Sequence, residues 1–168
     1  VIGPQNLYHG VESHGLLGSY FPPSYPAALG AFQQIDPMVF FFFHRRPFSG
    51  EFRIQWEGEL EISREESYSF TLDSSGPATL SIDGDTVIEN PGIPAGSAAP
   101  HASRTGEVRL ETGLHPIQVT FQYKYGSPQI YLNWSSPYES PRPLPWSRLH
   151  PASPRPLSDT NNLPQTTD

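Results

Sequence analysis

Histidine and carboxylate side chains are the usual catalytic and metal-binding groups, and their spacing in this 168-residue chain builds no reaction centre. None of the six histidines forms a His-x-x-x-His pair, the spacing that places two ligands on one face of a helix. The sequence also lacks a Gly-x-Ser-x-Gly motif and a glycine-rich phosphate loop. The histidines are His9, His14, His44, His101, His115 and His150. We therefore predict a protein without catalytic residues and without a metal site.

Alternating glutamates give the one pattern with acid–base potential. Glu57, Glu59 and Glu61 alternate with other residues, so they share the outward face of a predicted strand. Two carboxylates on such a face can reach the separation that glycosidases use. Charged strand residues more often simply remain in water. We interpret the row as a solvated strand face, with independent glycosidase activity as an alternative.

Polar and aromatic residues in predicted turns are better placed to contact a ligand. They occur in the turn 73–77, in an Asp-Gly turn at 83–84, in a long loop and at a hairpin tip. A tyrosine there offers an apolar ring with a polar end, which suits a partly wet site. Each is also an ordinary turn residue. The candidate ligand-binding residues are Asp73, Ser74, Ser75, Asp83, His101, Lys124 and Tyr125.

The segment 67–90, which contains both turns, predicts three short antiparallel strands. Apolar residues alternate over 68–72 and again over 78–82, the period of a strand with one buried face. A cluster of turn formers, 73–77, separates the first two strands, and we interpret it as a tight turn. Asp83-Gly84 is a favoured dipeptide for a two-residue hairpin, and the return strand starts at Thr86.

Further strands are predicted on both sides of this segment. Alternation over 52–62, with Gly58 at a bulge or bend, and over the hairpin 117–134 directs Trp56 and Trp134 into the core rather than onto an open platform. The run 39–43 is apolar without alternation, which predicts burial on both faces or cover by the preceding loop.

Two segments are predicted as loops. The first is 24–34, with a helical turn at 27–31. The second is 91–103, which is rich in proline and glycine and longer than a simple connection, so it is a candidate functional segment. A short strand at 108–110 is expected to follow it. From Pro151 the sequence has almost no apolar residues, which is typical of a linker or disordered tail.

Composition narrows the class of protein further. With 36% hydrophobic residues, 20 prolines and 14 glycines, the chain fits a single domain of short strands and turns. The net charge of −7 argues against a nucleic-acid partner. Without cysteine, a disulfide scaffold and a thiolate metal site are both excluded. No apolar run is long enough to span a bilayer, so we expect no direct membrane insertion.

The sequence resembles the protective-antigen-type (PA14) domain. The matching segments, in order, are 15–21 (Gly-Leu-Leu-Gly-Ser-Tyr-Phe), 52–60 (Phe-x-Ile-x-Trp-x-Gly-x-Leu), 70–88 and the hairpin 117–134, with a closing segment at 144–149. The resemblance implies an all-β fold, an antiparallel β-sandwich or flattened barrel. We predict a lead-in at 1–14, the domain at 15–150 and a linker or disordered tail at 151–168.

The resemblance also bears on calcium. In the calcium-dependent adhesins of this family, two adjacent aspartates in the turn hold Ca²⁺, which ligates sugar hydroxyls. Ser75 and Gly76 occupy those positions here, and neither supplies the charged oxygens that Ca²⁺ prefers. Asp83 also matches a family position, but it suits a hairpin turn better than a ligand. We therefore expect no cofactor, with calcium disfavoured.

The function implied by the resemblance is a non-catalytic module that binds carbohydrate or a glycoconjugate. Such modules belong to larger extracytoplasmic proteins, whether secreted, cell-surface or periplasmic. The Ser-x-Gly-Pro-Ala turn is similar to that of bacterial membrane glycosyltransferases, which suggests a glycan-active parent. The alternative is a structural or protein–protein interaction domain of an extracellular or envelope assembly.

Overall fold

The computed structural model describes residues 14–22, 30–155 and 157, and they form two groups of strands. One group consists of β1 (Leu16–Phe21), β2 (Phe32–Asp36), β4 (Phe52–Ile62), β6 (Ala78–Ile82), β7 (Asp85–Asn90), β9 (Gly113–Tyr123) and β12 (Leu149–Pro151). The other consists of β3 (Phe40–Phe42), β5 (Glu66–Ser74), β8 (Ala102–Leu110), β10 (Gln129–Ser136) and β11 (Glu139–Pro143). Within the described residues no helix is long and apolar enough to cross a membrane.

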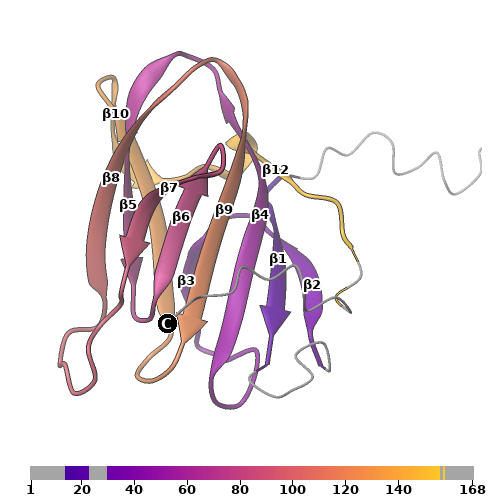
Figure 1. The fold of residues 1–168 in the computed structure, drawn as a ribbon, viewed down its shortest axis with the longest axis vertical. Coiled ribbons are helices and arrows are strands. Elements are labelled where there is room, and N and C mark those ends of the chain that lie inside the picture. Colours follow the sequence, from indigo (N-terminus) through magenta and orange to yellow (C-terminus); the bar gives the residue numbers. More distant parts are fainter. Residues whose placement is uncertain (1–13, 23–29, 156, 158–168) are drawn as a thin grey trace, which may run out of the picture.

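The two groups are antiparallel sheets packed face to face (Figure 1). The larger sheet has the order β2-β1-β4-β9-β6-β7, with β12 paired to β4. The smaller sheet has the order β11-β10-β5-β8, with β3 paired to β10. Of the two predicted architectures, the β-sandwich is therefore the one observed.

Inward rows from both sheets form the core, as the alternation predicts. Trp56 is fully buried and Trp134 is 5% exposed, so both tryptophans lie in the core. Trp134 stacks on Tyr68 with the ring centroids 5.1 Å apart. Glu59 is exposed on the opposite face of β4, while Glu57 pairs with Arg155 at 2.8 Å. The glutamate row thus lies outside the core, on the face that faces solvent.

Two predicted hairpins are wrong. The strands β5 and β6 belong to different sheets, and so do β9 and β10, so the segments 75–77 and 124–128 are arches that cross between the sheets. Turn-forming residues end a strand in either case, and packing of the whole chain decides where the next strand pairs. The β6–β7 hairpin is confirmed, with Asp83 and Gly84 at φ 55° and 80°.

Burial and extent differ from the prediction at two edge strands. Phe40 and Phe42 are 44% and 47% exposed, because β3 pairs with β10 on one side and shows one of its faces to solvent. Phe41 alone of this strand points inward and stacks on Trp56. Residues 32–34, predicted as the end of a loop, belong to β2, which pairs with β1. A largely polar segment can form an edge strand because the neighbouring strand supplies its backbone hydrogen-bond partners.

Other boundaries also shift. The strand β8 is much longer than predicted and begins at Ala102, so the preceding loop ends at His101. Residues 152–155, predicted as part of a tail, contact the larger sheet: the Ala152 amide donates to the Glu57 carbonyl at 3.2 Å. Three predicted segments lie wholly or partly outside the described residues. They are residues 1–13 of the lead-in, residues 27–29 of the helical turn, and the tail from residue 158 onward together with residue 156.

A buried carboxylate joins three strands of the larger sheet and explains the opening motif. Asp36 accepts hydrogen bonds from the Tyr20 hydroxyl, from Nε1 of Trp56 at 2.8 Å and from Nε2 of Gln34 at 2.8 Å. A Cβ atom on Gly18 would lie 2.5 Å from this carboxylate. Burial and the Asp36 charge together raise the pKa of Tyr20 far above its ordinary value. Gly18 and Tyr20 of the opening motif and Trp56 of the segment 52–60 therefore pack together around Asp36.

Because Trp134 lies in the core, we expect its removal to lower the free energy of unfolding. Replacing Trp134 by alanine should cost about 3–5 kcal/mol of unfolding free energy, because it leaves a cavity against Tyr68. Urea unfolding measures this loss. The matched control is Asn133→Ala on the outer face of the same strand, which should stay within about 0.5 kcal/mol. Equal losses for both variants would mean that the facing of β10 is inverted.

Candidate functional site

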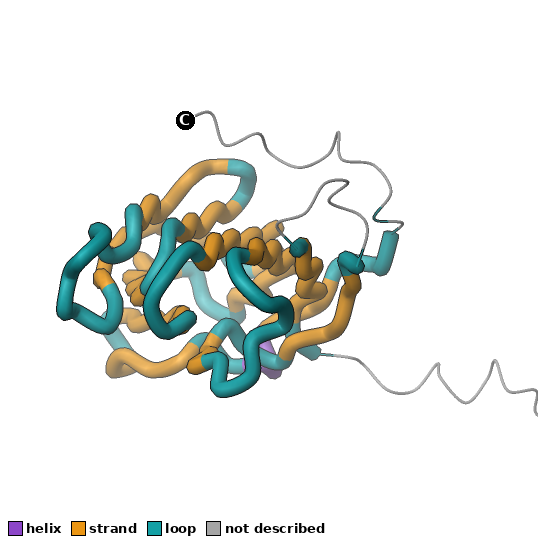
Figure 2. Tube along the Cα trace, turned by 90° about the horizontal axis from the view of Figure 1, so that it is seen from below, coloured by secondary structure: helices purple, strands orange, loops and turns teal. Residues whose placement is uncertain are grey.

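The two arches lie against each other at one end of the sandwich. The Ser75 amide donates to the Gln129 carbonyl at 3.0 Å, and the Gln129 amide donates to the Ser75 hydroxyl at 3.1 Å. Ser75 is buried by this contact. Figure 2 looks onto this end, where loops cover the ends of the strands. These bonds continue the β5–β10 pairing and hold the first arch to the start of β10, beside the place where the loops gather.

Glycine is required in the first arch. An ideal Cβ atom on Gly76 would lie 1.9 Å from the Gln122 carbonyl oxygen, so any side chain would displace the backbone of β9. Gly92, at φ 74°, packs its backbone against Gly76 in the same way, with its Cβ position 2.5 Å from the Gly76 carbonyl carbon. The chain thus has no room for a carboxylate at position 76, one of the two positions where the resemblance places calcium ligands.

A buried asparagine fixes the start of the long loop. The Asn90 amide group donates to the carbonyls of Leu72 and Ala102, each at 2.9 Å, and its oxygen accepts from the Gly92 amide at 2.8 Å. Farther along, the Tyr125 hydroxyl donates to the Ile93 carbonyl at 2.9 Å. The loop is therefore held between the smaller sheet and the second arch.

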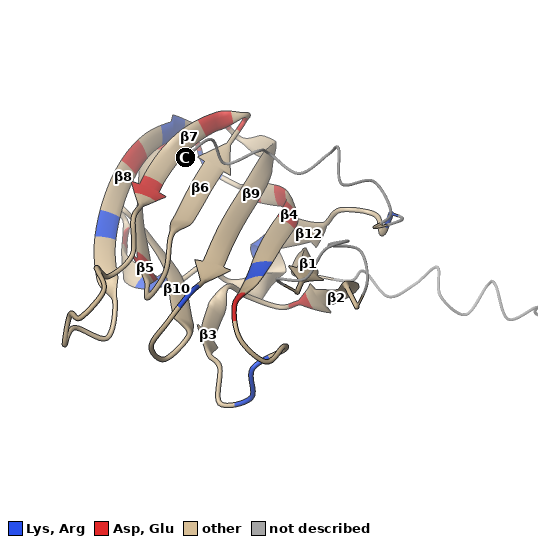
Figure 3. Ribbon diagram, turned by 60° about the horizontal axis from the view of Figure 1, so that its bottom comes forward, with Lys and Arg blue, Asp and Glu red and all other residues tan. Residues whose placement is uncertain are grey.

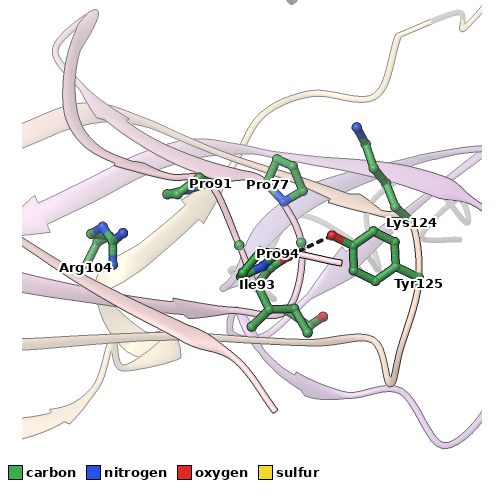
Figure 4. Close-up of a pocket in the computed structure, with 10 residues that line it drawn as sticks. Pro77, Pro91, Ile93, Pro94, Arg104, Lys124 and Tyr125 are labelled. Carbon is green, nitrogen blue, oxygen red and sulfur yellow. Dashed lines mark hydrogen bonds between the residues drawn. The ribbon is translucent and has the colours of Figure 1, made fainter. Parts of the chain in front are cut away.

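These segments enclose an open groove with a volume of about 390 Å³. Its lining contains two cationic side chains and no carboxylate. In Figure 4, Lys124 and Tyr125 lie on one side of the groove and Arg104 on the other, with prolines and Ile93 between them. The lining residues are Ser75, Gly76, Pro77, Pro91, Gly92, Ile93, Pro94, Arg104, Lys124 and Tyr125.

Of the sequence candidates, the groove brings together Ser75, Lys124 and Tyr125. Ser74 is buried and donates to the Gly76 carbonyl at 2.5 Å, which makes it part of the arch rather than of the lining. Asp73 and His101 are not among the lining residues; Asp73 faces outward in β5, and the His101 ring contacts Tyr131 with the centroids 6.0 Å apart.

Asp83 lies at the far end of β6 from the arch, so the structure does not bring it to the groove. Its Oδ2 atom is 2.8 Å from Nδ1 of His115, and Nε2 of His115 is 2.7 Å from the Glu111 carbonyl. Burial alone lowers the pKa of His115, but the hydrogen bonds to Glu111 and Asp83 outweigh it and raise that pKa above its ordinary value. Asp83 therefore connects the 83–84 turn, through His115, to the segment that begins β9.

Sequence reasoning missed Arg104 and the residues 91–94 as individual lining groups. The proline- and glycine-rich composition of 91–103 does signal this loop, whereas no sequence signal distinguishes Arg104 from other strand residues. Acidic and basic residues alternate along the coloured ribbon rather than being confined to separate strands (Figure 3). Among the described residues, no group of three or more His, Asp or Glu side chains could hold a metal ion.

A family model described as "PA14 domain" matches residues 13–145, which include both arches and the groove. The chain belongs to the PA14 domain family. The resemblance inferred from the motifs is therefore confirmed. No curated protein matches this PA14 domain.

Solved structures share the fold of this PA14 domain at low identity. An anti-sigma factor domain-containing protein from Clostridium clariflavum superposes with a TM-score of 0.70 at 22% identity, covering 84% of this chain and 48% of that one. The PA14 sugar-binding domain from an RTX adhesin gives 0.65 at 15%, covering 83% and 99%. The Epithelial Adhesin 6 A domain from Candida glabrata, in complex with Galb1-3GlcNAc, gives 0.61 at 12%, covering 85% and 88%. The chain spans about half the length of the anti-sigma factor protein.

We expect calcium to leave the stability of this PA14 domain unchanged, because Ser75 and Gly76 supply no carboxylate. A ligand at a hundredfold its dissociation constant would add about 2.7 kcal/mol to the unfolding free energy. Thermal melting in millimolar calcium and in chelator should therefore give the same midpoint. A calcium-dependent rise of several degrees would show that a cation site has been overlooked.

The Asp83–His115 contact should make stability depend on pH. A histidine whose pKa is higher in the folded state stabilises the fold most when both states are protonated, and this contribution is lost as the pH rises through the folded pKa. Asp83→Asn should therefore lower the unfolding free energy more at about pH 5.5 than at about pH 8.5.

The matched control is Asp85→Asn, which removes the same charge from the same hairpin. Asp85 pairs with Ile82 across the turn, and the His115 ring contacts Asp83 instead. Denaturant titrations at the two pH values compare the variants. A destabilisation by Asp83→Asn that stays constant or grows with pH would contradict the raised pKa of His115.

Proposed function

We propose that this PA14 domain is a non-catalytic carbohydrate-binding module and that the groove between the two arches and the long loop is its ligand site. The observation that carries the proposal is the lining itself. A tyrosine ring, two cationic donors and several prolines converge on a concave surface held by hydrogen bonds at its base. Preformed concavity with a few polar groups is the usual form of a small-molecule site.

The charge of the lining indicates which glycans fit. Arg104 and Lys124 only donate hydrogen bonds, and no lining carboxylate accepts them. Hydrogen bonds from cationic groups to carboxylate or sulfate oxygens are stronger than those between neutral groups. In an otherwise acidic chain, two unopposed cations favour glycans that carry acidic groups, bound without a bridging calcium ion.

The setting of the module is part of the same proposal. Proteins of this fold include the sugar-binding domain of an RTX adhesin and a segment of the GH31 alpha-xylosidase from Xanthomonas citri, of which this chain covers 14%. These parallels support an extracytoplasmic location and a larger adhesin or glycan-active enzyme as parent. A bacterial membrane glycosyltransferase is one such parent, favoured by the Ser-x-Gly-Pro-Ala turn.

A structural or protein-interaction role is the second candidate, and exposed aromatic residues near the closing segment favour it. Trp146 is 53% exposed and Tyr138 is 64% exposed. Arg64 lies over the Tyr138 ring at 3.8 Å. Surfaces of this composition occur at protein interfaces more often than elsewhere on a protein. Trp146 begins the short 3₁₀ helix η2 (Trp146–Arg148) and Tyr138 lies in the β10–β11 turn, and neither residue lines the groove.

Glycan-array binding of the full chain tests the proposed function. We expect binding to glycans with uronic or sialic acid units, unaffected by chelator, and weakened about tenfold or more in Lys124→Ala because one charge-assisted contact is lost. The matched control is Lys124→Arg, which keeps the charge. Binding that is equal in both variants, or absent from the whole array, would favour the interaction role instead.

A further inference from the structure

The outer face of the smaller sheet carries aromatic rings that the groove does not use. Phe40 and Phe42 project from β3 and are 44% and 47% exposed. The Phe40 ring lies 4.7 Å from Tyr131 on β10, and the Phe42 ring lies 4.8 Å from His44, centroid to centroid. Clustered exposed aromatic side chains on a folded domain mark interaction sites.

The register of the sheet arranges this face in straight rows. Tyr131 stands opposite Phe40 on one side and opposite Asp73 on the other, and Asp73 stands opposite Ser103. The row thus runs across β3, β10, β5 and β8 from aromatic rings to a carboxylate and a hydroxyl. The next row holds Pro143, Asn133, Thr71 and Thr105. Of the positions in these two rows, Asp73 is the one that is charged.

Neighbouring contacts hold the row in place. The His101 ring packs edge-on against Tyr131, and the Tyr131 hydroxyl donates to the Gln129 side chain at 3.3 Å. Burial and the charge of Asp73 raise the pKa of Tyr131, so the hydroxyl stays protonated. Gln129 is also the residue that binds Ser75 in the arch contact. The aromatic row is therefore built onto the same rigid framework as the groove.

We infer that the aromatic row Phe40, Tyr131 and Asp73, together with Phe42 beside it on β3, is a second glycan-binding surface. It binds a neutral polysaccharide through the faces of its sugar rings. The C–H face of a pyranose ring stacks on exposed aromatic rings, and its hydroxyls donate to the Asp73 carboxylate beside them. The charge of the row sets the class of ligand, because a lone carboxylate among uncharged side chains repels acidic chains and accepts from hydroxyls. The net charge of −7 likewise disfavours single-stranded nucleic acid, which also stacks on aromatic rings.

Affinity electrophoresis of the full chain tests this surface, with gels that contain a mixed-linkage β-glucan, a xylan or a galactomannan. We expect at least one polymer to retard the chain. The double variant Phe40→Ala/Phe42→Ala should lose about tenfold in association constant, because the stacking surface is removed. Tyr138→Ala, which removes an exposed aromatic ring elsewhere, should be retarded like the unaltered chain.

Two further variants separate folding and the groove from the aromatic row. Asp73→Asn keeps the shape of the side chain and should weaken retardation several-fold, with an unchanged melting temperature. Lys124→Ala should leave retardation by neutral polymers intact, so a failure of the groove proposal is distinguishable from a failure of this one.

The inference is overturned if no polymer retards the unaltered chain, or if the phenylalanine variant and Asp73→Asn both migrate like it. It is also overturned if sedimentation shows the unaltered chain as a dimer and the phenylalanine variant as a monomer, because the face would then be a contact between copies.

Discussion

The contact between the two arches is the constraint on which this PA14 domain depends. The chain crosses from one sheet to the other in each arch, and the two arches lie at the same end of the sandwich. Three hydrogen bonds join Ser75 in the first arch to Gln129, the β10 residue that follows the second arch, and Gly76 allows the first arch to lie directly on β9. Any larger residue at 76 would displace the backbone of β9 there. In this chain, the close approach of Gly76 to β9 therefore depends on glycine at that position.

The same contact shapes the candidate site. The Ser75 hydroxyl is buried against the backbone of Gln129 and Gly76 has no side chain, so neither position supplies a carboxylate to the groove. Glycine and proline make up half of the groove lining, and its charged groups are Arg104 and Lys124. Under the proposed function, the hydrogen-bond donors of Arg104 and Lys124 recognise the ligand.

The sequence predicts the strands better than their partners. Alternation identifies the inward positions of Trp56 and Trp134, because burial of one face is a local property of a strand. It does not distinguish an arch from a hairpin at 75–77, since the same turn formers serve both. Phe40 and Phe42 looked buried because hydrophobicity does not reveal which face of an edge strand is covered. The turn-forming sequence was enough to predict the lining residues Ser75, Lys124 and Tyr125. Arg104 could not be predicted, because its place in the lining follows from the packing of β8 beside the long loop.

Chemical-shift mapping most directly tests whether the groove binds glycans. The ¹⁵N-labelled chain would be titrated with an oligosaccharide of uronic acids, and backbone amide shifts followed residue by residue. We expect the largest changes at Gly76, Ile93 and Tyr125, with little change at the Asp83 turn. Saturable changes confined to other parts of the molecule, or none at millimolar ligand, would contradict the assignment of the groove as the carbohydrate site.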